Sequence, residues 1–253
     1  MKPSRKDAPA FRDASERISA AATYRRGAEN YHLARPSYPD EVTSLLPPGG
    51  TVLDVGAGTG KLTELLLQAD RTVYACDPSA EMTEVLRRAL PDVPVWRATA
   101  EDTALASASV DAVVAAQVWH WVDPDRASAE AHRVVRDGGH LMLCWNTLDV
   151  SHPWVLRLSR IMHSGDVLRE GFYPTVAAPW RLVEERRVSW IQPVTTGDLF
   201  DLMATRSYWM RSTEKTRATM TNNLTWYLYE RLGFDEGQLL PLPYRTDAFV
   251  YAR

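Results

Sequence analysis

A glycine-rich stretch with an acid just before it is the first part of the chain whose residue types suggest chemistry. VLDVGAGTGKL runs from residue 52 to residue 62, with glycines at 56, 58 and 60 and Asp54 ahead of them. The bulky apolar residues around Asp54 suit a buried parallel strand, and the leucines behind the glycines recur at helical spacing. Glycine adopts a positive φ without strain and lets the backbone approach a ligand. The stretch therefore predicts a strand, a tight turn and a helix, with a ligand bound against the turn.

Two familiar nucleotide-binding motifs fit this stretch poorly. The dinucleotide fingerprint G-x-G-x-x-G/A needs a small third residue, where this chain has Lys61. A P-loop needs glycine where Val55 stands and a hydroxyl where Leu62 stands. A nicotinamide or flavin site is thereby disfavoured. The pattern that remains is an acid at the end of a strand, followed by G-x-G-x-G.

Further acids follow the next two predicted strands. Asp77 ends the strand TVYAC, near the spacing of about 20 residues at which an acid meets ribose hydroxyls. A helix N-cap beside Pro78 is a compatible structural role for it. In the stretch TAED, Glu101 or Asp102 is placed where a carboxylate could accept from an adenine amino group, with the N–H of Ala100 beside the ring. An exposed turn explains that stretch equally well.

A histidine between two tryptophans follows the fourth predicted strand. Residues 117 to 121 read QVWHW, and the unperturbed pKa of histidine, about 6.5, suits a general base. His120 is therefore the candidate for removing a proton from a substrate. The alternative interpretation is that Trp119, His120 and Trp121 form a packing and shape element at the mouth of a pocket.

Aromatic and basic residues in the C-terminal part are candidates for binding a substrate. The chain has nine Trp and ten Tyr, most of which must lie in the core. A few, with Tyr208 among them, are expected to line an apolar or aromatic acceptor pocket. Arg245 and Arg206 could neutralise an acceptor carboxylate, although a surface or structural role explains each of them as well.

The elements that must position these residues alternate between strand and helix from residue 51 to residue 146, the pattern of a doubly wound parallel sheet. An amphipathic helix is expected over 82–90. Asp123 is expected to begin the helix after the fourth strand, and Gly138 and Gly139 to close it. The later strands are expected at 93–98, 110–117 and 140–145. Ligands bind at the carboxyl ends of such strands, so the acids and His120 should share one edge of the sheet.

Beyond Asn146 the alternation stops. Residues 147–185 are expected to be an irregular insertion, followed by a strand at 186–192 and helices at 197–206 and 213–232. LPLPY and DAFVYAR suggest two antiparallel edge strands. We expect residues 147–253 to form a helical cap with C-terminal strands, and residues 1–40 and 147–185 to close over the site as a lid.

Length and composition favour one globular α/β domain over residues 1–253, with 45% hydrophobic and 24% charged residues. A net charge of -3 offers no basic surface for nucleic acid. The opening residues lack the apolar segment of a secretion signal, and no apolar run approaches about 18 residues. A cytoplasmic protein without membrane segments is expected. Cys76 and Cys144 sit in apolar runs and the histidines lack metal-ligand spacing, so no metal is predicted.

The order and spacing of these pieces resemble the class I S-adenosylmethionine-dependent methyltransferases over residues 45–146, with the glycine stretch as motif I. More narrowly, AQ-x-x-HW after strand four and Y-x-x-x-RP-x-YP at 31–39 are similar to a small-molecule branch that includes trans-aconitate methyltransferase-like proteins. Asp137 departs from the family, which usually has proline before the two glycines. That departure affects only a helix stop.

The resemblance implies a seven-stranded, mostly parallel Rossmann-like sheet, S-adenosylmethionine as cofactor, and a role for each matching residue. Gly56, Ala57 and Gly58 would face the methionine part, Asp54 its ammonium group and Arg35 its carboxylate. Asp77 would bind the ribose, Met82 and Ala100 the adenine, and Glu101 the adenine amino group. Cofactor contacts are also expected for Pro78 and Gln117, and acceptor contacts for Trp119, Trp121, Tyr208 and Arg245. Arg35 has a second interpretation, as the anchor of an N-terminal helix.

The predicted activity is methyl transfer to an oxygen or nitrogen of a small metabolite, with a carboxylate as the specific variant that the resemblance suggests. The reaction is a one-step displacement, so alignment of the acceptor and exclusion of water matter most. Two alternatives remain open at this stage. They are a nicotinamide-dependent oxidoreductase and a non-catalytic S-adenosylmethionine-binding module. The identity of the acceptor and the oligomeric state are left open by the sequence.

Overall fold

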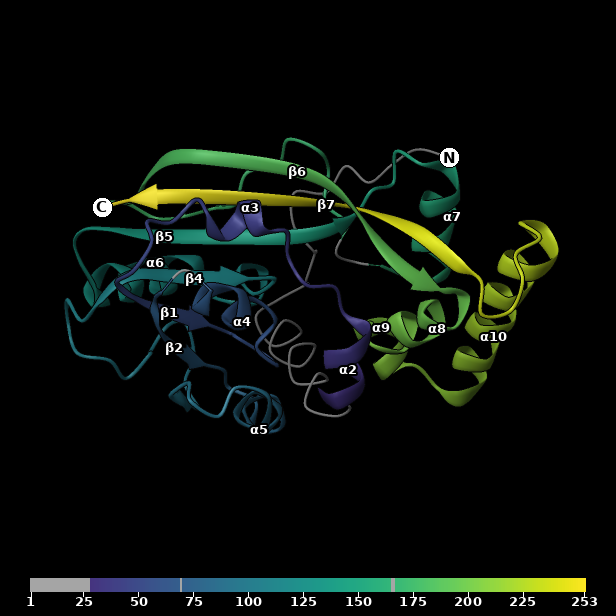
Figure 1. The fold of residues 1–253 in the computed structure, drawn as a ribbon, viewed down its shortest axis with the longest axis horizontal. Coiled ribbons are helices and arrows are strands. Elements are labelled where there is room, and N and C mark those ends of the chain that lie inside the picture. The colour runs from purple at the N-terminus through teal and green to yellow at the C-terminus, as the bar shows by residue number, and fades with distance from the viewer. Residues whose placement is uncertain (1–27, 69, 165–166) are drawn as a thin grey trace. The chain divides into compact units, whose positions relative to one another are not determined.

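The computed structural model describes residues 28–68, 70–164 and 167–253. Seven strands form one mixed sheet in the order β3-β2-β1-β4-β5-β7-β6, with β7 antiparallel (Figure 1). The predicted Rossmann-like α/β fold is confirmed. The strands are β1 (Thr51–Val55), β2 (Thr72–Cys76), β3 (Val95–Trp96), β4 (Val110–Ala116), β5 (Val135–Leu148), β6 (Arg181–Thr195) and β7 (Leu239–Ala252).

The described chain divides into two compact units. The helical unit comprises the described residues up to Pro36, with Thr147–Tyr173 and Ser189–Arg245. The core unit comprises Ser37–Asn146, Pro174–Val188 and Thr246–Arg253. The single domain with its three sequence segments stays a prediction. Of the predicted lid, residues 1–27 lie outside the described residues.

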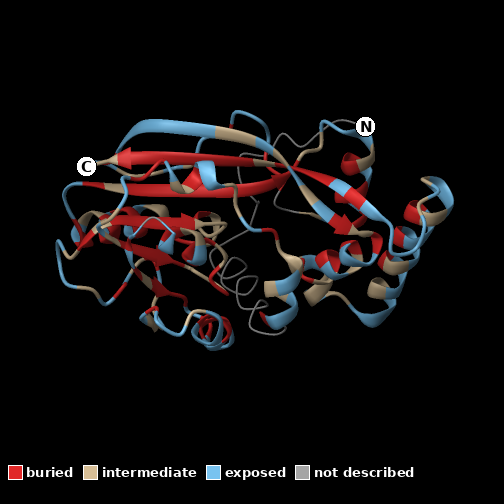
Figure 2. Ribbon diagram, viewed as in Figure 1, coloured by how far each residue is buried: buried red, intermediate tan, exposed pale blue. Residues whose placement is uncertain are grey.

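The core unit is built on five parallel strands, since β1 pairs with β2 and β4, β2 with β3, and β4 with β5. Its helices are α3 (Asp40–Thr43), α4 (Lys61–Leu67), α5 (Ala80–Ala89), the 3-10 helix η2 (Trp119–Trp121) and α6 (Pro124–Val134). The start of α6 is as expected, because the Asp123 carboxylate accepts from the N–H groups of Asp125 and Arg126. Apolar residues on both faces of these strands are buried, which suits a parallel sheet (Figure 2).

The end of α6 differs from the prediction. The helix stops at Val134 and β5 begins at once, so Gly138 and Gly139 lie inside the strand. A register shift between β4 and β5 falls in this region. A Cβ on Gly139 would lie 2.5 Å from the carbonyl oxygen of Asp111. The glycine therefore allows two backbones to approach at an irregularity in the sheet, rather than ending a helix.

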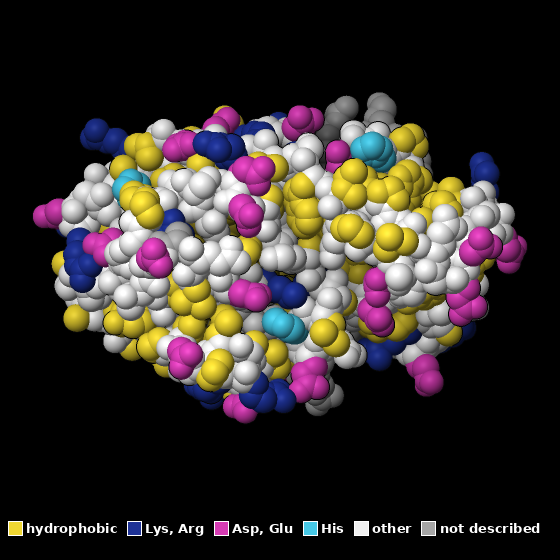
Figure 3. Space-filling model, viewed as in Figure 1, with side chains coloured by type: hydrophobic (Ala, Val, Ile, Leu, Met, Phe, Trp, Pro, Cys, Tyr) yellow, Lys and Arg dark blue, Asp and Glu magenta, His cyan; other side chains and the backbone are white. Residues whose placement is uncertain are grey.

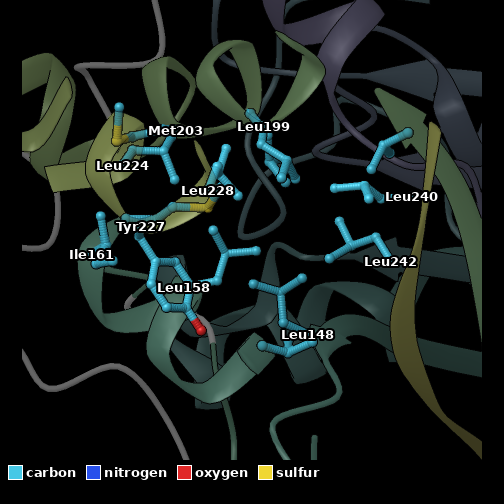
Figure 4. Packing of buried hydrophobic residues seen from close by; sticks show 14 of the residues in the cluster. Leu148, Leu158, Ile161, Leu199, Met203, Leu224, Tyr227, Leu228, Leu240 and Leu242 are labelled. Carbon is cyan, nitrogen blue, oxygen red and sulfur yellow. The ribbon is translucent and has the colours of Figure 1, made fainter. Parts of the chain in front are cut away.

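The helical unit has its own apolar core. The helices of this unit are α2 (Ala28–Ala34), α7 (Pro153–Ile161), α8 (Thr196–Ala204), α9 (Ser207–Arg211), α10 (Glu214–Thr225) and the π-helix η3 (Trp226–Arg231). Leu158, Leu199 and Leu228 are fully buried in one cluster with leucines of β7 (Figure 4). The expectation of an irregular stretch over residues 147–185 was wrong in part, because α7 lies within it and β6 begins at Arg181. The helical spacing of Val155, Leu158 and Met162 is the signal that was missed.

The two predicted edge strands at the C-terminus are one strand, β7, and it lies between β5 and β6 rather than at an edge. Thr246 and Asp247 lie where the two predicted strands meet, and both are buried with a partner. The Thr246 hydroxyl donates to Asn146 Oδ1 at 2.6 Å, and Asp247 accepts from Arg187 at 2.8 Å. Satisfied hydrogen bonds allow polar groups inside a sheet.

Other features bear on the function classes considered above. No helix among the described residues is long and apolar enough to cross a membrane. Acidic and basic side chains are interspersed over the face of the molecule in Figure 3. Across residues 28–68, 70–164 and 167–253, no group of three or more His, Cys, Asp or Glu is placed to hold a metal ion. Cys76 and Cys144 are buried, and burial raises the pKa of both thiols.

Candidate functional site

The glycine turn after β1 has three left-handed residues with different surroundings. Gly56, Gly58 and Gly60 have φ of +63°, +56° and +91°. A Cβ on Gly56 would lie 2.4 Å from Val118 Cγ2, and one on Gly60 would lie 3.0 Å from Leu86 Cγ. A Cβ on Gly58 would meet nothing within 4 Å among the described residues. Gly56 and Gly60 therefore allow close packing, and Gly58 is the one whose backbone faces open space. The predicted contacts of Gly56, Ala57 and Gly58 with a cofactor stay predictions.

Asp54 is a buried carboxylate at the end of β1. Its Oδ2 accepts from the Thr63 hydroxyl at 2.7 Å, while its buried Oδ1 has no hydrogen-bond partner among the described residues. Burial raises the pKa of Asp54 to about 7, the Thr63 hydrogen bond lowers it, and the charge of Asp77 raises it further. Such a carboxylate would be stabilised in its ionised form by a cationic group placed against Oδ1.

Asp77, at the end of β2, organises the turn through both oxygens. Oδ2 accepts from the Gly58 N–H at 3.0 Å, and Oδ1 accepts from the Ser79 N–H at 2.8 Å. Burial raises the pKa of Asp77, although these two N–H donors lower it. Ser79, rather than Asp77, is the N-cap of α5, because its hydroxyl accepts from the Met82 N–H. The N-cap role considered for Asp77 thus belongs to a residue two positions on.

The residues predicted to surround an adenine are arranged around the start of α5 and the segment after β3. Met82 and Ala100 are buried, while Pro78 is exposed. Glu101 Oε1 accepts from the backbone N–H of Asp123 at 2.9 Å, so this carboxylate is tied to the start of α6. The contacts of these residues with a cofactor stay predictions.

The chain turns sharply at the end of β4, where Gln117 has a left-handed φ of +59°. Its N–H donates to the Cys144 carbonyl at 2.9 Å, and its Nε2 donates to the Asn146 carbonyl at 2.6 Å. Its buried Oε1 has no partner within the described part of the chain. The next residue, Val118, is the one that fills the space beside Gly56. The left-handed turn therefore brings the end of β4 against the glycine turn.

His120 is held by an indole. Trp145 Nε1 donates to His120 Nδ1 at 3.3 Å, and the Trp121 ring lies 4.7 Å away, centroid to centroid. A ring nitrogen that accepts a hydrogen bond carries no proton, so the neutral imidazole has its proton on Nε2. In this tautomer Nε2 is a donor. The geometry therefore favours hydrogen-bond donation by His120 over proton removal through Nε2.

The two tryptophans beside His120 have different surroundings. Trp119 is buried and its indole N–H donates to the Thr175 carbonyl at 2.8 Å. Trp121 is half-buried against His120. Trp119 therefore has a structural contact of its own, as the packing interpretation expected. Contact of either ring with an acceptor stays a prediction.

Three predicted site residues lie in the helical unit. The Arg35 guanidinium donates to the Thr205 hydroxyl and carbonyl at 3.0 and 3.1 Å, which supports its second interpretation as an anchor of α2. Tyr208 stacks on His163 with centroids 4.0 Å apart. Arg245 Nη2 donates to the carbonyls of Leu168 and Arg169. Their expected contacts with cofactor or acceptor are not tested by these interactions.

Several site residues were missed in the sequence. Thr63 lies in the first turn of α4, where a hydroxyl can face back toward the end of β1, so its position was a usable signal. Asn146 had none. Its Nδ2 donates to the Ser37 carbonyl at 2.8 Å and its Oδ1 accepts from Thr246 at 2.6 Å, so it joins segments far apart along the chain.

Comparisons with known proteins agree on one class. A family model described as "Methyltransferase domain" matches residues 53–143. An uncharacterized methyltransferase of Mycobacterium tuberculosis is 42% identical over 231 residues, covering 90% of this chain and 91% of the relative. An uncharacterized methyltransferase-like protein of Schizosaccharomyces pombe is 35% identical over 147 residues, covering 55% of this chain and 57% of the relative. A solved structure described as a "Putative Type II Methyltransferase" from Anaeromyxobacter dehalogenans has a TM-score of 0.61 at 24% identity, covering 87% of this chain and 97% of that one, and supports the fold alone.

Proposed function

Because the chain belongs to the class I S-adenosylmethionine-dependent methyltransferases, we propose that it methylates an oxygen or nitrogen of a small metabolite. The proposal extends to the small-molecule branch that includes trans-aconitate methyltransferase-like proteins, with a carboxylate oxygen as the specific acceptor. Family membership decides against the nicotinamide-dependent alternative. The cofactor is S-adenosylmethionine.

The observation that carries the cofactor part of the proposal is that two buried acids, Asp54 and Asp77, lie around the open backbone of Gly58. Asp54 Oδ1 has no partner in the described part of the chain and belongs to a carboxylate whose pKa burial raises to about 7. An ammonium group at that oxygen would satisfy it and favour its ionised form. Gly58 leaves space for a ligand beside the same turn. These features fit the methionine end of S-adenosylmethionine.

The residues around the cofactor have binding and orienting roles. Asp77 has both oxygens on backbone N–H groups, and a carboxylate oxygen has two lone pairs, so it can accept from ribose hydroxyls as well. Bound S-adenosylmethionine supplies an electrophilic methyl group on a sulfonium. The chain then has to align an acceptor in line with that methyl group and keep water away.

His120 is proposed to orient the acceptor by donating from Nε2, in line with the hydrogen bond that Trp145 gives to Nδ1. A histidine in this tautomer cannot remove a proton through Nε2 until the Nδ1 bond is exchanged. The base role stays as the alternative for an acceptor that loses a proton. A carboxylate acceptor is already ionised near neutral pH and needs no base.

A small acceptor is proposed on charge and residue type. The net charge of -3 is unfavourable for the phosphate backbone of nucleic acid. Trp121 and Tyr208 are partly exposed aromatics that suit an apolar or aromatic body. Arg245 is the residue that a carboxylate acceptor needs, because its guanidinium can pair with a carboxylate.

The first experiment is titration calorimetry with S-adenosylmethionine. We expect low-micromolar affinity for the wild type and about a tenfold to hundredfold loss in Asp77→Ala, because the ribose loses a charged acceptor. The matched control is Asp92→Ala, at an exposed acid of the same unit. Equal affinity in Asp77→Ala and Asp92→Ala would refute the ribose assignment.

The acceptor is then sought by incubating metabolite extracts, RNA and protein with radiolabelled S-adenosylmethionine. Label in a small molecule that falls sharply in Arg245→Ala supports the carboxylate variant. Label in RNA or protein contradicts the small-molecule proposal. Cofactor binding without transfer to any of these fractions would favour the non-catalytic binding module.

A further inference from the structure

We propose that the edge strand β6 pairs antiparallel with β6 of a second copy of this chain, which joins two sheets across a twofold axis. The segment concerned is residues 181–188, which lies in the core unit. It reads RLVEERRV. The sheet order places β6 at the end of the sheet, with β7 as its neighbour. Its outer edge can therefore accept another strand.

The first half of β6 is exposed to an unusual degree for a strand. Residues 181–186 are all exposed, as Figure 2 shows in pale blue. Two of them are apolar, with Leu182 40% and Val183 57% exposed. Natural edges are usually blunted by charged side chains, lysine above all, or by proline, a bulge or short length, and the charges of this segment are of both signs. Residues 181–188 contain neither lysine nor proline, and β6 is 15 residues long.

Side chains on one face of the segment are Leu182, Glu184, Arg186 and Val188, because alternate residues of a strand share a face. The Arg186 guanidinium contacts the Glu184 carboxylate at 2.8 Å, which agrees with that placement. A twofold axis perpendicular to the sheet keeps this face on the same side in both copies. The antiparallel register must then be centred on a residue, not between two residues.

The register centred on Glu185 makes this face self-complementary. Glu184 lies opposite the partner's Arg186, and Arg186 lies opposite the partner's Glu184. Leu182 lies opposite the partner's Val188, and the symmetric pair repeats that contact. Opposite charges and apolar pairs directly across an antiparallel ladder are each stabilising. Centring on Arg186 would instead place Glu184 opposite the partner's Val188 and Arg186 opposite the partner's Arg186, which loses the opposite-charge pairs.

On the other face this register is unfavourable at one pair, because Glu185 lies opposite the partner's Glu185 and the two carboxylates repel. Arg187 reduces that repulsion. Its Nη2 lies 3.7 Å from Glu185 Oε2, and its Nη1 is held by the buried Asp247 at 2.8 Å, so one anchored cation from each copy lies beside the two carboxylates. Charges of one sign along an edge would repel a second copy. Residues 184–187, EERR, carry both signs, so this edge can attract the same edge of a second copy.

Sedimentation velocity from micromolar to sub-millimolar concentration tests the proposal. We expect the wild type to reach twice its chain mass of 28.5 kDa. Glu184→Arg places like charges together in both symmetric pairs, so the dimer Kd should rise about tenfold or more, and Arg186→Glu should do the same. The swap Glu184→Arg with Arg186→Glu restores opposite charges and should restore dimerisation.

The matched control is Glu84→Arg, which makes the same charge change at an exposed glutamate of α5. Circular dichroism checks that each variant is folded. A wild type that stays at monomer mass overturns the proposal. So does a dimer that tolerates Glu184→Arg, one that Glu84→Arg weakens as much, or a charge swap that restores nothing. The result does not depend on any methyl transfer.

Discussion

Two halves of the candidate site are assembled by contacts of very different range. In the half around the glycine turn, Asp54 bonds to Thr63, nine residues on, and Asp77 bonds to Gly58, 19 residues back. In the half at the ends of β4 and β5, Asn146 bonds to Ser37 and Thr246, 109 and 100 residues away. Both halves are in the core unit.

The difference shows that one half of the site is formed by contacts within a short sequence motif, and the other half by contacts between distant segments of the chain. The glycine-turn half is one βα unit and the start of the next, so its side chains meet whenever those local elements form. The other half needs the N-terminal segment, β5 and β7 to be in place together. Each half can therefore be disturbed in a way that leaves the other intact, and three changes test this.

The largest effect is expected from Gly56→Ala, compared with Gly58→Ala. Both positions have positive φ, which costs a side chain about 1–2 kcal/mol. At Gly56 the new methyl group also clashes with Val118, which adds about 1–3 kcal/mol. We expect Gly56→Ala to lose about 2–5 kcal/mol of unfolding free energy and Gly58→Ala about 1–2, as measured by urea denaturation.

The affinity for S-adenosylmethionine should be affected in the opposite order: we expect a loss of affinity in Gly58→Ala, the variant that loses less stability. Gly58→Ala puts a methyl group into the space proposed for S-adenosylmethionine, and it should lose affinity while staying folded. Calorimetry on both variants checks this. Equal stability loss at the two positions would show that Val118 gives way and that the halves are not packed as described.

The second largest effect is expected from Asp54→Asn, which should change how the stability of the protein depends on pH. The folded pKa of Asp54, about 7, lies above the ordinary aspartate value of 3.8, so the folded state holds the proton more tightly. Stability of the cofactor-free protein should therefore fall as pH rises from about 4 to about 7, by about 2–4 kcal/mol. Asp54→Asn removes this slope, and the part due to Asp77, whose pKa is also raised, remains.

Urea unfolding across the pH range, without cofactor, measures both slopes. In the wild type, the ionised carboxylate is the form that binds an ammonium group, so S-adenosylmethionine affinity should rise with pH over the same window. Asp54→Asn should bind weakly at every pH. Parallel stability profiles for the two proteins would mean that Asp54 does not titrate in that window.

The smallest effect is expected from Trp145→Phe, which keeps an aromatic ring but removes the N–H that bonds to His120. Loss of one hydrogen bond should cost about 1 kcal/mol of stability. Nitrogen-15 NMR should show His120 passing from the Nε2–H tautomer to a mixture of both. The control is Trp180→Phe, which loses the indole bond to the Ser128 carbonyl and leaves His120 unchanged. A wild-type His120 with its proton on Nδ1 would contradict the assigned tautomer.

Much of the fold and half of the site could be predicted from the sequence. The glycine turn, Asp54 and Asp77 follow from patterns within about 30 residues, where a strand, a turn and a helix leave few arrangements. Alternation of strands and helices likewise predicted the doubly wound sheet. The chemistry of S-adenosylmethionine followed from the resemblance of that segment to a family, and the comparisons agree with it.

The tertiary structure decided what depends on distant segments. How closely Gly56 packs on Val118, and which nitrogen of His120 holds its proton, depend on side chains from other elements. Thr246 and Asp247 lie inside the single strand β7, where the sequence predicted two strands. Asn146 and Arg187, about 100 and 60 residues away, satisfy them there, and hydrogen bonds between such distant residues leave no periodic pattern in the sequence.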